Sequence, residues 1–167
     1  PTPRAAPRAA HALMTRQFKT VAESQHESSE IMMPQDANIL GHVFGGAILG
    51  MMDKVAAIAA FRHARTNVVT ISIDRVDFKE PIHVGDLLIM KSSVNFVGRT
   101  SMEIGVRVET ENLLTGVRLH TNSCYLTFVA IDRNGTPVPV PPLQPETPDE
   151  IRRHDAARAR RERRLHE

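Results

Sequence analysis

The stretch PQDANILGHVFGGAILGMMD, residues 34–53, runs from a polar loop through two adjacent glycines into an apolar segment. From Phe44 to about Arg65, apolar side chains recur at spacings of three and four residues. They are Ile48, Leu49, Met52, Val55, Ala56 and Ala59. This period predicts a long helix with one buried face. A single carboxylate, Asp53, interrupts the apolar run and needs a separate explanation.

Alternating apolar and polar residues predict strands on both sides of this helix. Before the helix, residues 19–33 are interpreted as one strand. After it, four strands are predicted at residues 69–78, 87–97, 102–109 and 117–131. The apolar set changes parity at Val76 and Phe78, which predicts a β-bulge, and Asn134-Gly135 predicts a tight turn with positive φ. One strand, one long helix and four further strands indicate an α+β fold, in which an antiparallel sheet covers a single helix.

The composition divides the chain of 167 residues into three parts. Residues 1–18 are rich in Pro, Ala and Arg and contain no acids, which predicts a disordered arm. A transit peptide and a biological start at Met14 are the alternatives. Residues 19–142 form the predicted domain, and residues 143–167 form an Arg-rich helical tail.

Several functional classes are disfavoured by charge and composition. Residues 22–148 hold 10 basic and 14 acidic side chains, whereas a nucleic-acid-binding core normally has a basic face. The chain contains no run of about 18 apolar residues, the length that a membrane-spanning helix needs. We therefore expect a soluble, cytoplasmic protein. The single Cys124 lies in an apolar strand pattern that indicates a packed, reduced thiol. The histidines lack the spacing of a zinc site, and no metal is expected.

The beginning of the predicted helix offers donors for a negative charge. Backbone N–H groups in the first turn have no partner within a helix, and Gly45 and Gly46 let a ligand approach them. Two such donors can form an oxyanion site, although glycines here could equally serve only close packing. Eight residues at about 1.5 Å rise put Gly45 and Asp53 about 12 Å apart along the axis. If both act on one carbonyl, they must come from different chains.

Four segments of this chain resemble the hotdog-fold acyl-CoA thioesterases of the cytosolic acyl-CoA hydrolase group. They are MPQDANILGHVFGGAILGMMD (33–53), FKEPIHVGD (78–86), VGRTSMEIGVRVE (97–109) and HTNSCYLTFVAID (120–132). The resemblance covers residues 20–142. It implies a hotdog fold with an antiparallel sheet wrapped around one long central helix, and homodimers with two sites that commonly form a trimer of dimers. It also implies hydrolysis of a fatty acyl-CoA to free acid and CoA, without a cofactor, because coenzyme A is part of the substrate and product.

The resemblance assigns catalytic roles to four positions. The family's active-site asparagine matches Asn38, and its carboxylate matches Asp53. The glycine whose amide faces the thioester oxygen matches Gly45 or Gly46. Asp53 would act either as a general base on water or as a nucleophile that forms a mixed anhydride. His42 lies where relatives carry various polar residues, so a supporting role is expected for it.

A second set of residues is expected to bind coenzyme A. Without the resemblance, VGRTSM is either a plain turn with a solvated Arg99 or a ligand contact. With it, an arginine beside hydroxyls suits the phosphate or pantetheine of CoA, which assigns contacts to Gly98, Arg99, Thr100 and Ser101. Thr70 and Ser72 are weaker candidates. The Arg-rich tail is interpreted as a solvated helix, and contact with the adenine and 3′-phosphate of CoA, or between dimers, is its functional alternative.

Two other functions fit the same fold. Hotdog dehydratases and hydratases pair a catalytic His with a carboxylate, whereas this segment offers Asn38 and Asp53. A non-catalytic acyl-CoA sensor coupled to DNA needs a DNA-binding module, for which the residues before the domain are too few. Hydrolysis is therefore the preferred function.

Overall fold

The computed structural model describes residues 17–167, so the predicted arm lies outside the described residues except for its last two positions. Five strands form one antiparallel sheet in the order β2-β4-β5-β6-β3. They are β2 (His26–Ile31), β3 (Asn67–Ile73), β4 (Leu87–Val97), β5 (Ser101–Glu111) and β6 (Arg118–Ile131). The long helix α2 (Gly45–Ala64) lies between β2 and β3 in the chain. Within this five-stranded sheet, the predicted order of one strand, one long helix and four strands is confirmed.

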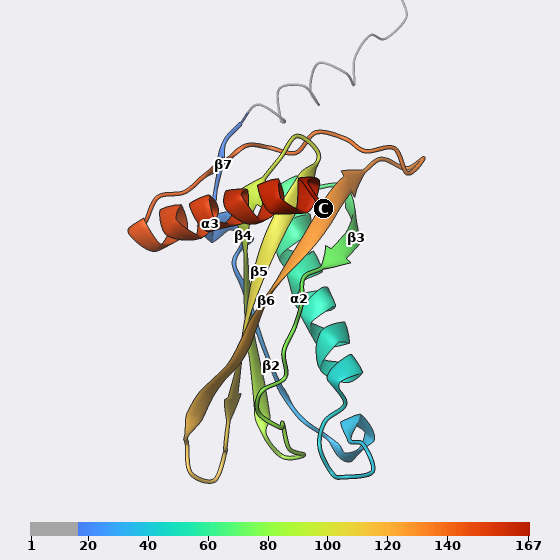
Figure 1. Ribbon diagram of the computed structural model, residues 1–167, viewed down its shortest axis with the longest axis vertical. Coiled ribbons are helices and arrows are strands. Elements are labelled where there is room, and N and C mark those ends of the chain that lie inside the picture. The colour runs from blue at the N-terminus through green and yellow to red at the C-terminus, as the bar shows by residue number, and fades with distance from the viewer. Residues whose placement is uncertain (1–16) are drawn as a thin grey trace, which may run out of the picture.

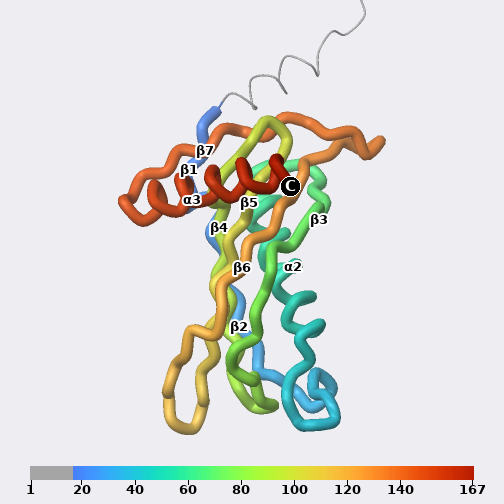
Figure 2. The backbone as a smooth tube through the Cα atoms, in the orientation of Figure 1, coloured from blue at the N-terminus to red at the C-terminus, as the bar shows by residue number. Residues whose placement is uncertain are grey.

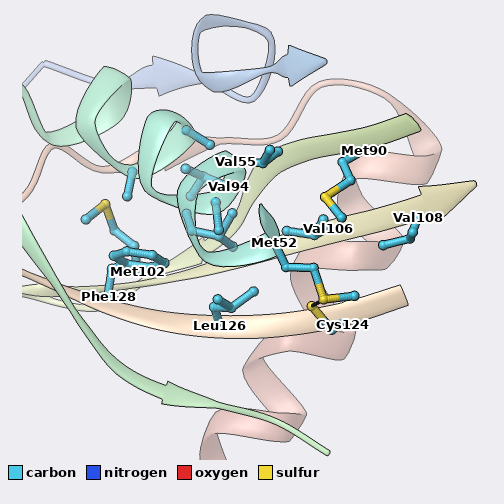
Figure 3. Close-up of a cluster of buried hydrophobic side chains, with 14 of the residues drawn as sticks. Met52, Val55, Met90, Val94, Met102, Val106, Val108, Cys124, Leu126 and Phe128 are labelled. Carbon is cyan, nitrogen blue, oxygen red and sulfur yellow. Dashed lines mark hydrogen bonds between the residues drawn. The ribbon is translucent and has the colours of Figure 1, made fainter. Parts of the chain in front are cut away.

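Helix α2 packs its apolar stripe against one face of the sheet (Figure 1). The predicted face is confirmed, because Ile48, Met52, Val55, Ala56 and Ala59 are buried while Leu49 is half-buried. Figure 3 shows Met52 and Val55 over side chains of β4, β5 and β6, among them Val94, Val106 and Leu126. Burial of this stripe therefore fixes which face of α2 meets the sheet, and leaves its other face outside the core.

The end of α2 is set by its backbone and by a lysine. Arg65 has a left-handed conformation with φ 52°, which stops the helix. The Lys19 ammonium donates to the carbonyl oxygens of Arg62 at 3.2 Å and His63 at 2.8 Å. A cation at the carbonyl end of a helix also suits the helix dipole. This contact ties the first described segment of the chain to the end of α2.

The single strand predicted over residues 19–33 is wrong in detail. The structure has β1 (Lys19–Thr20), a 3-10 turn (Ala22–Ser24) and then β2. The turn forms because the buried Ser24 hydroxyl donates to the Val21 carbonyl at 2.8 Å and accepts from the Val94 amide at 3.0 Å. A second 3-10 turn (Pro34–Asp36) follows β2 and leads into the segment before α2.

The predicted bulge is also misplaced. Strand β3 ends at Ile73, so the parity change at Val76 and Phe78 marks the exit from the sheet. The register shift lies earlier, between Thr70 and Ser72, where β3 pairs with β6. In the later turn, Gly135 has a φ of 79°, whereas Asn134 does not have the predicted positive φ.

The C-terminal segment packs on the opposite face of the sheet. Strand β7 (Leu143–Gln144) pairs in parallel with β1, and α3 (Pro148–Leu165) follows. Thr147 and Glu150 form a capping box at the start of α3. Figures 1 and 3 show the strands of the sheet between α2 and α3. The tail is a helix with mostly exposed residues, as predicted, but Arg160 and Arg164 also attach it to the sheet through Glu103 and Asp74.

Candidate active site

Asp53 and Thr70 form a pair between α2 and the edge strand β3. The Thr70 hydroxyl donates to Asp53 Oδ1 at 2.7 Å. No other described residue bonds to the Asp53 carboxylate, so its second oxygen is available to a water or a ligand. Asp53 is half-buried, and its neighbour Met52 lies in the core. The helix therefore holds the carboxylate at the boundary of the core, and Thr70 fixes its orientation.

The first turn of α2 has two amides without partners among the described residues. The first helical hydrogen bonds are donated by Ala47 and Ile48 to the Phe44 carbonyl. The amides of Gly45 and Gly46 precede them and have no intrahelical acceptor. A Cβ on Gly46 would meet no atom within 4 Å, and one on Gly45 would lie 3.3 Å from the Phe78 ring. Space beside the backbone is therefore open at Gly46.

Asn38 lies in the loop just before α2, and its side chain is oriented by that loop. Its Oδ1 accepts from the backbone amides of Leu40 at 2.9 Å and His42 at 3.2 Å. Two backbone donors identify the oxygen end of the amide, so Nδ2 faces away from the loop. No described residue accepts from Nδ2. Asn38 can therefore donate to a ligand, as its predicted role requires.

Within the described residues of one protomer, no hydrogen bond joins Asp53 to Asn38 or to the first turn of α2. Figure 2 shows the segment before α2 at one end of the elongated molecule, whereas β3 lies beside the other half of α2. Asn38 bonds only within its own loop, and Asp53 bonds only to Thr70, among the described residues. The donors at the start of α2 and the carboxylate are thus two separate groups within one chain.

The turn between β4 and β5 contains the other predicted residues. The Gly98 amide donates to the Ser101 carbonyl at 2.8 Å, which closes the turn. The carbonyls of Arg99 and Thr100 accept from Val140 and Ala130, each at 2.9 Å. The Arg99 side chain is exposed. The backbone of this turn is therefore fixed, and the Arg99 guanidinium is free to contact a ligand.

Ser72 and Ser101 meet in a cleft on the outer face of the sheet, where α3 lies. Arg161 and Arg164 of α3 line the same cleft. Thr70 does not share this face, since it bonds to Asp53 on α2. The register shift between Thr70 and Ser72 separates two residues that simple alternation would place together. The sequence thus predicted Ser72 and Ser101 without the arginines beside them, and missed the link of Thr70 to Asp53.

Other candidate residues have structural roles. Cys124 is buried, with Sγ 3.6 Å from Met52 Sδ, and burial raises the pKa of its thiol to about 12. The prediction of a packed thiol is confirmed. His42 stacks edge-on against His83 with ring centroids 5.1 Å apart. Within residues 17–167, no group of three His, Cys, Asp or Glu side chains is arranged to hold a metal.

A curled antiparallel sheet around one long central helix defines a protein of the hotdog class. Residues 40–117 match the family described as Thioesterase superfamily. Protein VdlD of Helicobacter pylori is 44% identical over 134 residues, which cover 80% of this chain and 76% of VdlD. The Bacillus subtilis protein named uncharacterized acyl-CoA thioester hydrolase YkhA is 42% identical over 143 residues, 86% of this chain and 83% of its own. The rat cytosolic acyl coenzyme A thioester hydrolase is 36% identical over 84% of this chain and 38% of its own.

Solved structures agree with these relatives. A hexameric acyl-CoA thioesterase superimposes with a TM-score of 0.86 at 46% identity, covering 89% of this chain and 96% of its own. The Staphylococcus aureus acyl-CoA hydrolase, solved with butyryl coenzyme A and coenzyme A, gives 0.83 at 38% identity over 89% and 91% of the two chains. The chain belongs to the thioesterase superfamily, within the hotdog-fold acyl-CoA thioester hydrolases.

Proposed function

We propose that this protein hydrolyses fatty acyl-CoA to a free acid and CoA, at sites that two protomers share. Each site takes Asp53 from one protomer, and Asn38 with the amides of Gly45 and Gly46 from the other. The observation that carries this proposal is the separation within one chain. Asp53 is held by Thr70 on β3, whereas Gly45 lies about 12 Å away along α2 and Asn38 precedes the helix.

Variants of the Staphylococcus aureus enzyme support the choice of residues. Its solved structures include separate replacements of an Asn, an Asp and a Thr by Ala. By their numbers, the Asn and the Asp are 15 positions apart, and the Asp and the Thr are 17 apart. Asn38, Asp53 and Thr70 have the same two separations here. The coincidence of residue types and separations favours these three positions as a functional set.

The chemistry follows from the free atoms of each group. The Asn38 amide and a glycine N–H hold the thioester oxygen, which gains charge as the carbonyl is attacked. The unpartnered Asp53 oxygen takes a proton from water, and the water oxygen bonds to the carbonyl carbon. The C–S bond then breaks, the thiolate takes the proton, and the acid is released. In the alternative path, an Asp53 oxygen bonds to the thioester carbon and the CoA thiolate leaves, which gives a mixed anhydride that water then hydrolyses. In single turnover in heavy-oxygen water, label in the Asp53 carboxylate would identify this path, with water attacking the Asp53 carbonyl.

The edge strand β3 supports a homodimer. It is the last strand of the sheet, and it carries the exposed apolar residues Val69, Ile71 and Ile73. An unpaired apolar edge is a liability in a free monomer. A second copy of the chain paired along β3 would cover this apolar edge, and the dimer interface would then lie beside Thr70 and Asp53. The structural relatives described as hexameric suit a trimer of such dimers.

Two further expectations belong to this proposal. No cofactor is needed, because water and the carboxylate suffice for hydrolysis. A cytoplasmic location suits a chain with relatives named cytosolic. None of the helices in residues 17–167 has the length and apolar character needed to cross a bilayer.

The proposal is tested by following thiol release from acyl-CoA substrates of increasing chain length with a thiol-reactive dye. Asp53→Asn keeps the size of the side chain and removes its charge. We expect the rate to fall by at least about 100-fold, the low end of general-base catalysis, with the oligomer unchanged in light scattering. Parental turnover in the variant would exclude Asp53 as the base or nucleophile. Absence of thiol release by the parent on every chain length would refute hydrolysis itself.

A further inference from the structure

The cleft between α3 and the outer face of the sheet has the chemistry of an anion site. Its volume is about 240 Å³. It is lined by three hydroxyl residues, Ser72 of β3, Ser101 of β5 and Thr127 of β6, and by Arg161 and Arg164 of α3. Four separate elements thus bring hydroxyls and guanidinium groups to one place. This cleft lies on the face of the sheet opposite α2.

Glu103 also lines the cleft, and the arginines in and next to the cleft outnumber the carboxylates there by one. Glu103, 3% exposed, accepts from Arg160 at 2.7 Å and from Arg164 at 2.9 Å. Arg164 also pairs with Asp74 at 2.7 Å. Arg161, by contrast, pairs with no carboxylate of residues 17–167, and stands 5.9 Å from the Phe96 ring. Three arginines face two carboxylates, so Arg161 carries charge that no described carboxylate balances.

An unpartnered hydroxyl points to the same conclusion. Thr127 Oγ1 is buried and has no hydrogen-bond partner among the described residues. A buried polar atom without a partner costs about 1–3 kcal/mol, and such atoms often mark a site that a ligand completes. Thr127 is therefore ready to bond to a group that enters the cleft.

Gly98 allows the cleft to have this form. A Cβ at Gly98 would lie 2.8 Å from Ser101 Oγ and 3.1 Å from the Arg161 guanidinium. Any larger residue would displace one of these two groups, and both line the cleft. Gly98 was predicted as a turn residue that contacts coenzyme A. Its structural contribution is to let Arg161 approach the turn beside Ser101.

The bulge in β3 connects this cleft to the proposed active site. Thr70 reaches Asp53 on one face of the strand, and Ser72 lines the cleft on the other. The two residues are about 7 Å apart along the strand. A ligand bound at Ser72 therefore lies near Thr70, the residue of β3 that bonds to the Asp53 carboxylate.

We propose that this cleft binds a phosphate group, with Arg161 as the charged partner and the hydroxyls of Ser72, Ser101 and Thr127 as the neutral ones. Guanidinium and hydroxyl groups together suit phosphate oxygens. The phosphate has two possible sources. It belongs either to the nucleotide end of the acyl-CoA substrate, which rests on the proposed function, or to a free nucleotide that binds apart from the substrate.

The test compares Arg161→Gln and Thr127→Val with the parent protein. Arg158→Gln is the matched control, because Arg158 is an exposed arginine of the same helix. For each protein, the rate of hydrolysis is measured with an acyl-CoA and with the corresponding acyl-pantetheine, which has the same thioester and no phosphate. Binding of adenosine 3′,5′-bisphosphate, the nucleotide part of CoA, and of inorganic phosphate is measured by calorimetry.

If the substrate supplies the phosphate, Arg161→Gln raises KM for acyl-CoA about tenfold, the lower range for a hydrogen bond to a charged group. It leaves kcat and the hydrolysis of acyl-pantetheine unchanged, and Thr127→Val has a smaller effect in the same direction. If a free nucleotide supplies the phosphate, Arg161→Gln leaves KM for acyl-CoA unchanged and weakens binding of the bisphosphate about tenfold. Unchanged KM and unchanged binding in both variants, or an equal effect in Arg158→Gln, would overturn the proposal. A parent that hydrolyses neither thioester refutes the proposed function instead. The binding measurements by themselves then test whether the cleft binds phosphate.

Discussion

Asp53 combines two properties that rarely occur together on an apolar helix. Its helix position beside Met52 brings it to the boundary of the core, and its single described partner is a neutral hydroxyl. No described arginine or lysine pairs with its carboxylate, so the negative charge stays available for proton transfer. A structural carboxylate at such a boundary would normally have an ionic or capping partner. The environment of Asp53 therefore favours a catalytic role over a structural one.

Thr70 is predicted to position Asp53. Thr70→Val keeps the branched shape and removes the 2.7 Å hydrogen bond to Oδ1. A hydrogen bond to a charged group contributes about 1.5–3 kcal/mol, so we expect kcat in the thiol-release assay to fall about tenfold or more, with KM nearly unchanged. Thr70→Ser retains the hydroxyl and should stay within about threefold of the parent. Equal rates for the valine and serine variants would show that this bond does not act in turnover.

At the scale of elements, α3 is attached by a buried charge network. Glu103 is almost fully buried, and it bonds to both Arg160 and Arg164. The Arg160 guanidinium also stacks over the Tyr125 ring at 3.6 Å. Such a network is costly to break on one side, because the remaining charges stay buried without partners. The same contacts hold Arg161 at the cleft.

Glu103→Gln should lower the free energy of unfolding by about 3 kcal/mol, since removal of one partner of a buried ion pair typically costs that much or more. Urea unfolding followed by circular dichroism measures the change. Glu162→Gln on α3 is the control. Glu162 is exposed and has no described ion pair, so its replacement should change stability by no more than about 0.5 kcal/mol. A loss in Glu103→Gln as small as in the control would show that α3 docks without this network.

The C-terminal end of α2 should make stability depend on pH. His63 is fully buried, and its Nε2 donates to the Pro141 carbonyl at 2.7 Å. Burial lowers the pKa of His63 below its usual value, with the hydrogen bond to Pro141 opposing and the charge of Lys19 adding to the shift. Its Nδ1 has no partner among the described residues. Protonation would therefore place an unpaired N–H and a charge in the interior.

The unfolded chain binds this proton more readily than the folded protein does. Stability from neutral His63 is therefore fully present above pH about 6.5 and is lost as the pH falls toward the lower folded pKa. Thermal unfolding between pH about 5 and 7.5 should show a falling Tm on acidification. His63→Gln cannot titrate and should show a flatter dependence than the parent. Parallel curves for the two proteins would assign the acid sensitivity to other groups.

At the scale of the whole molecule, the shared site has a quantitative consequence. Asp53→Asn chains and Asn38→Ala chains are each expected to be inactive alone. In a mixed dimer, one site contains both wild-type groups and the other contains neither. With equal mixing and random pairing, about half of the dimers are mixed, so about a quarter of parental activity should return. The thiol-release assay measures the recovered activity.

Mass spectrometry of tagged chains checks that the subunits exchange. Two Asp53→Asn preparations with different tags, mixed in the same way, are the control and should stay inactive. Exchange without recovered activity would mean that Asn38 and Asp53 serve one site from one chain. The division of the site between protomers would then be wrong, although hydrolysis itself would stand.

The sequence by itself determined the main elements and the family. The spacing of Ile48, Met52 and Val55 is enough to predict α2, because a helix repeats its buried face every three to four residues. Alternation likewise predicted four of the main strands. The motifs around Asn38 and Asp53 predicted the family. The rise per residue of a helix indicated that Gly45 and Asp53 of one chain are too far apart to act on the same carbonyl.

Only the tertiary structure decided which of these residues meet. Thr70 bonds to Asp53 across 17 positions, Arg160 to Glu103 across 57, and Arg164 to Asp74 across 90. Such contacts leave no periodic signal, because they depend on sheet register and on where α3 docks. The register shift at Thr70 and Ser72 is the clearest case, since one irregular residue sends two similar side chains to opposite faces. Periodicity is a property of local backbone geometry, whereas a binding site is made by elements that are distant in the chain.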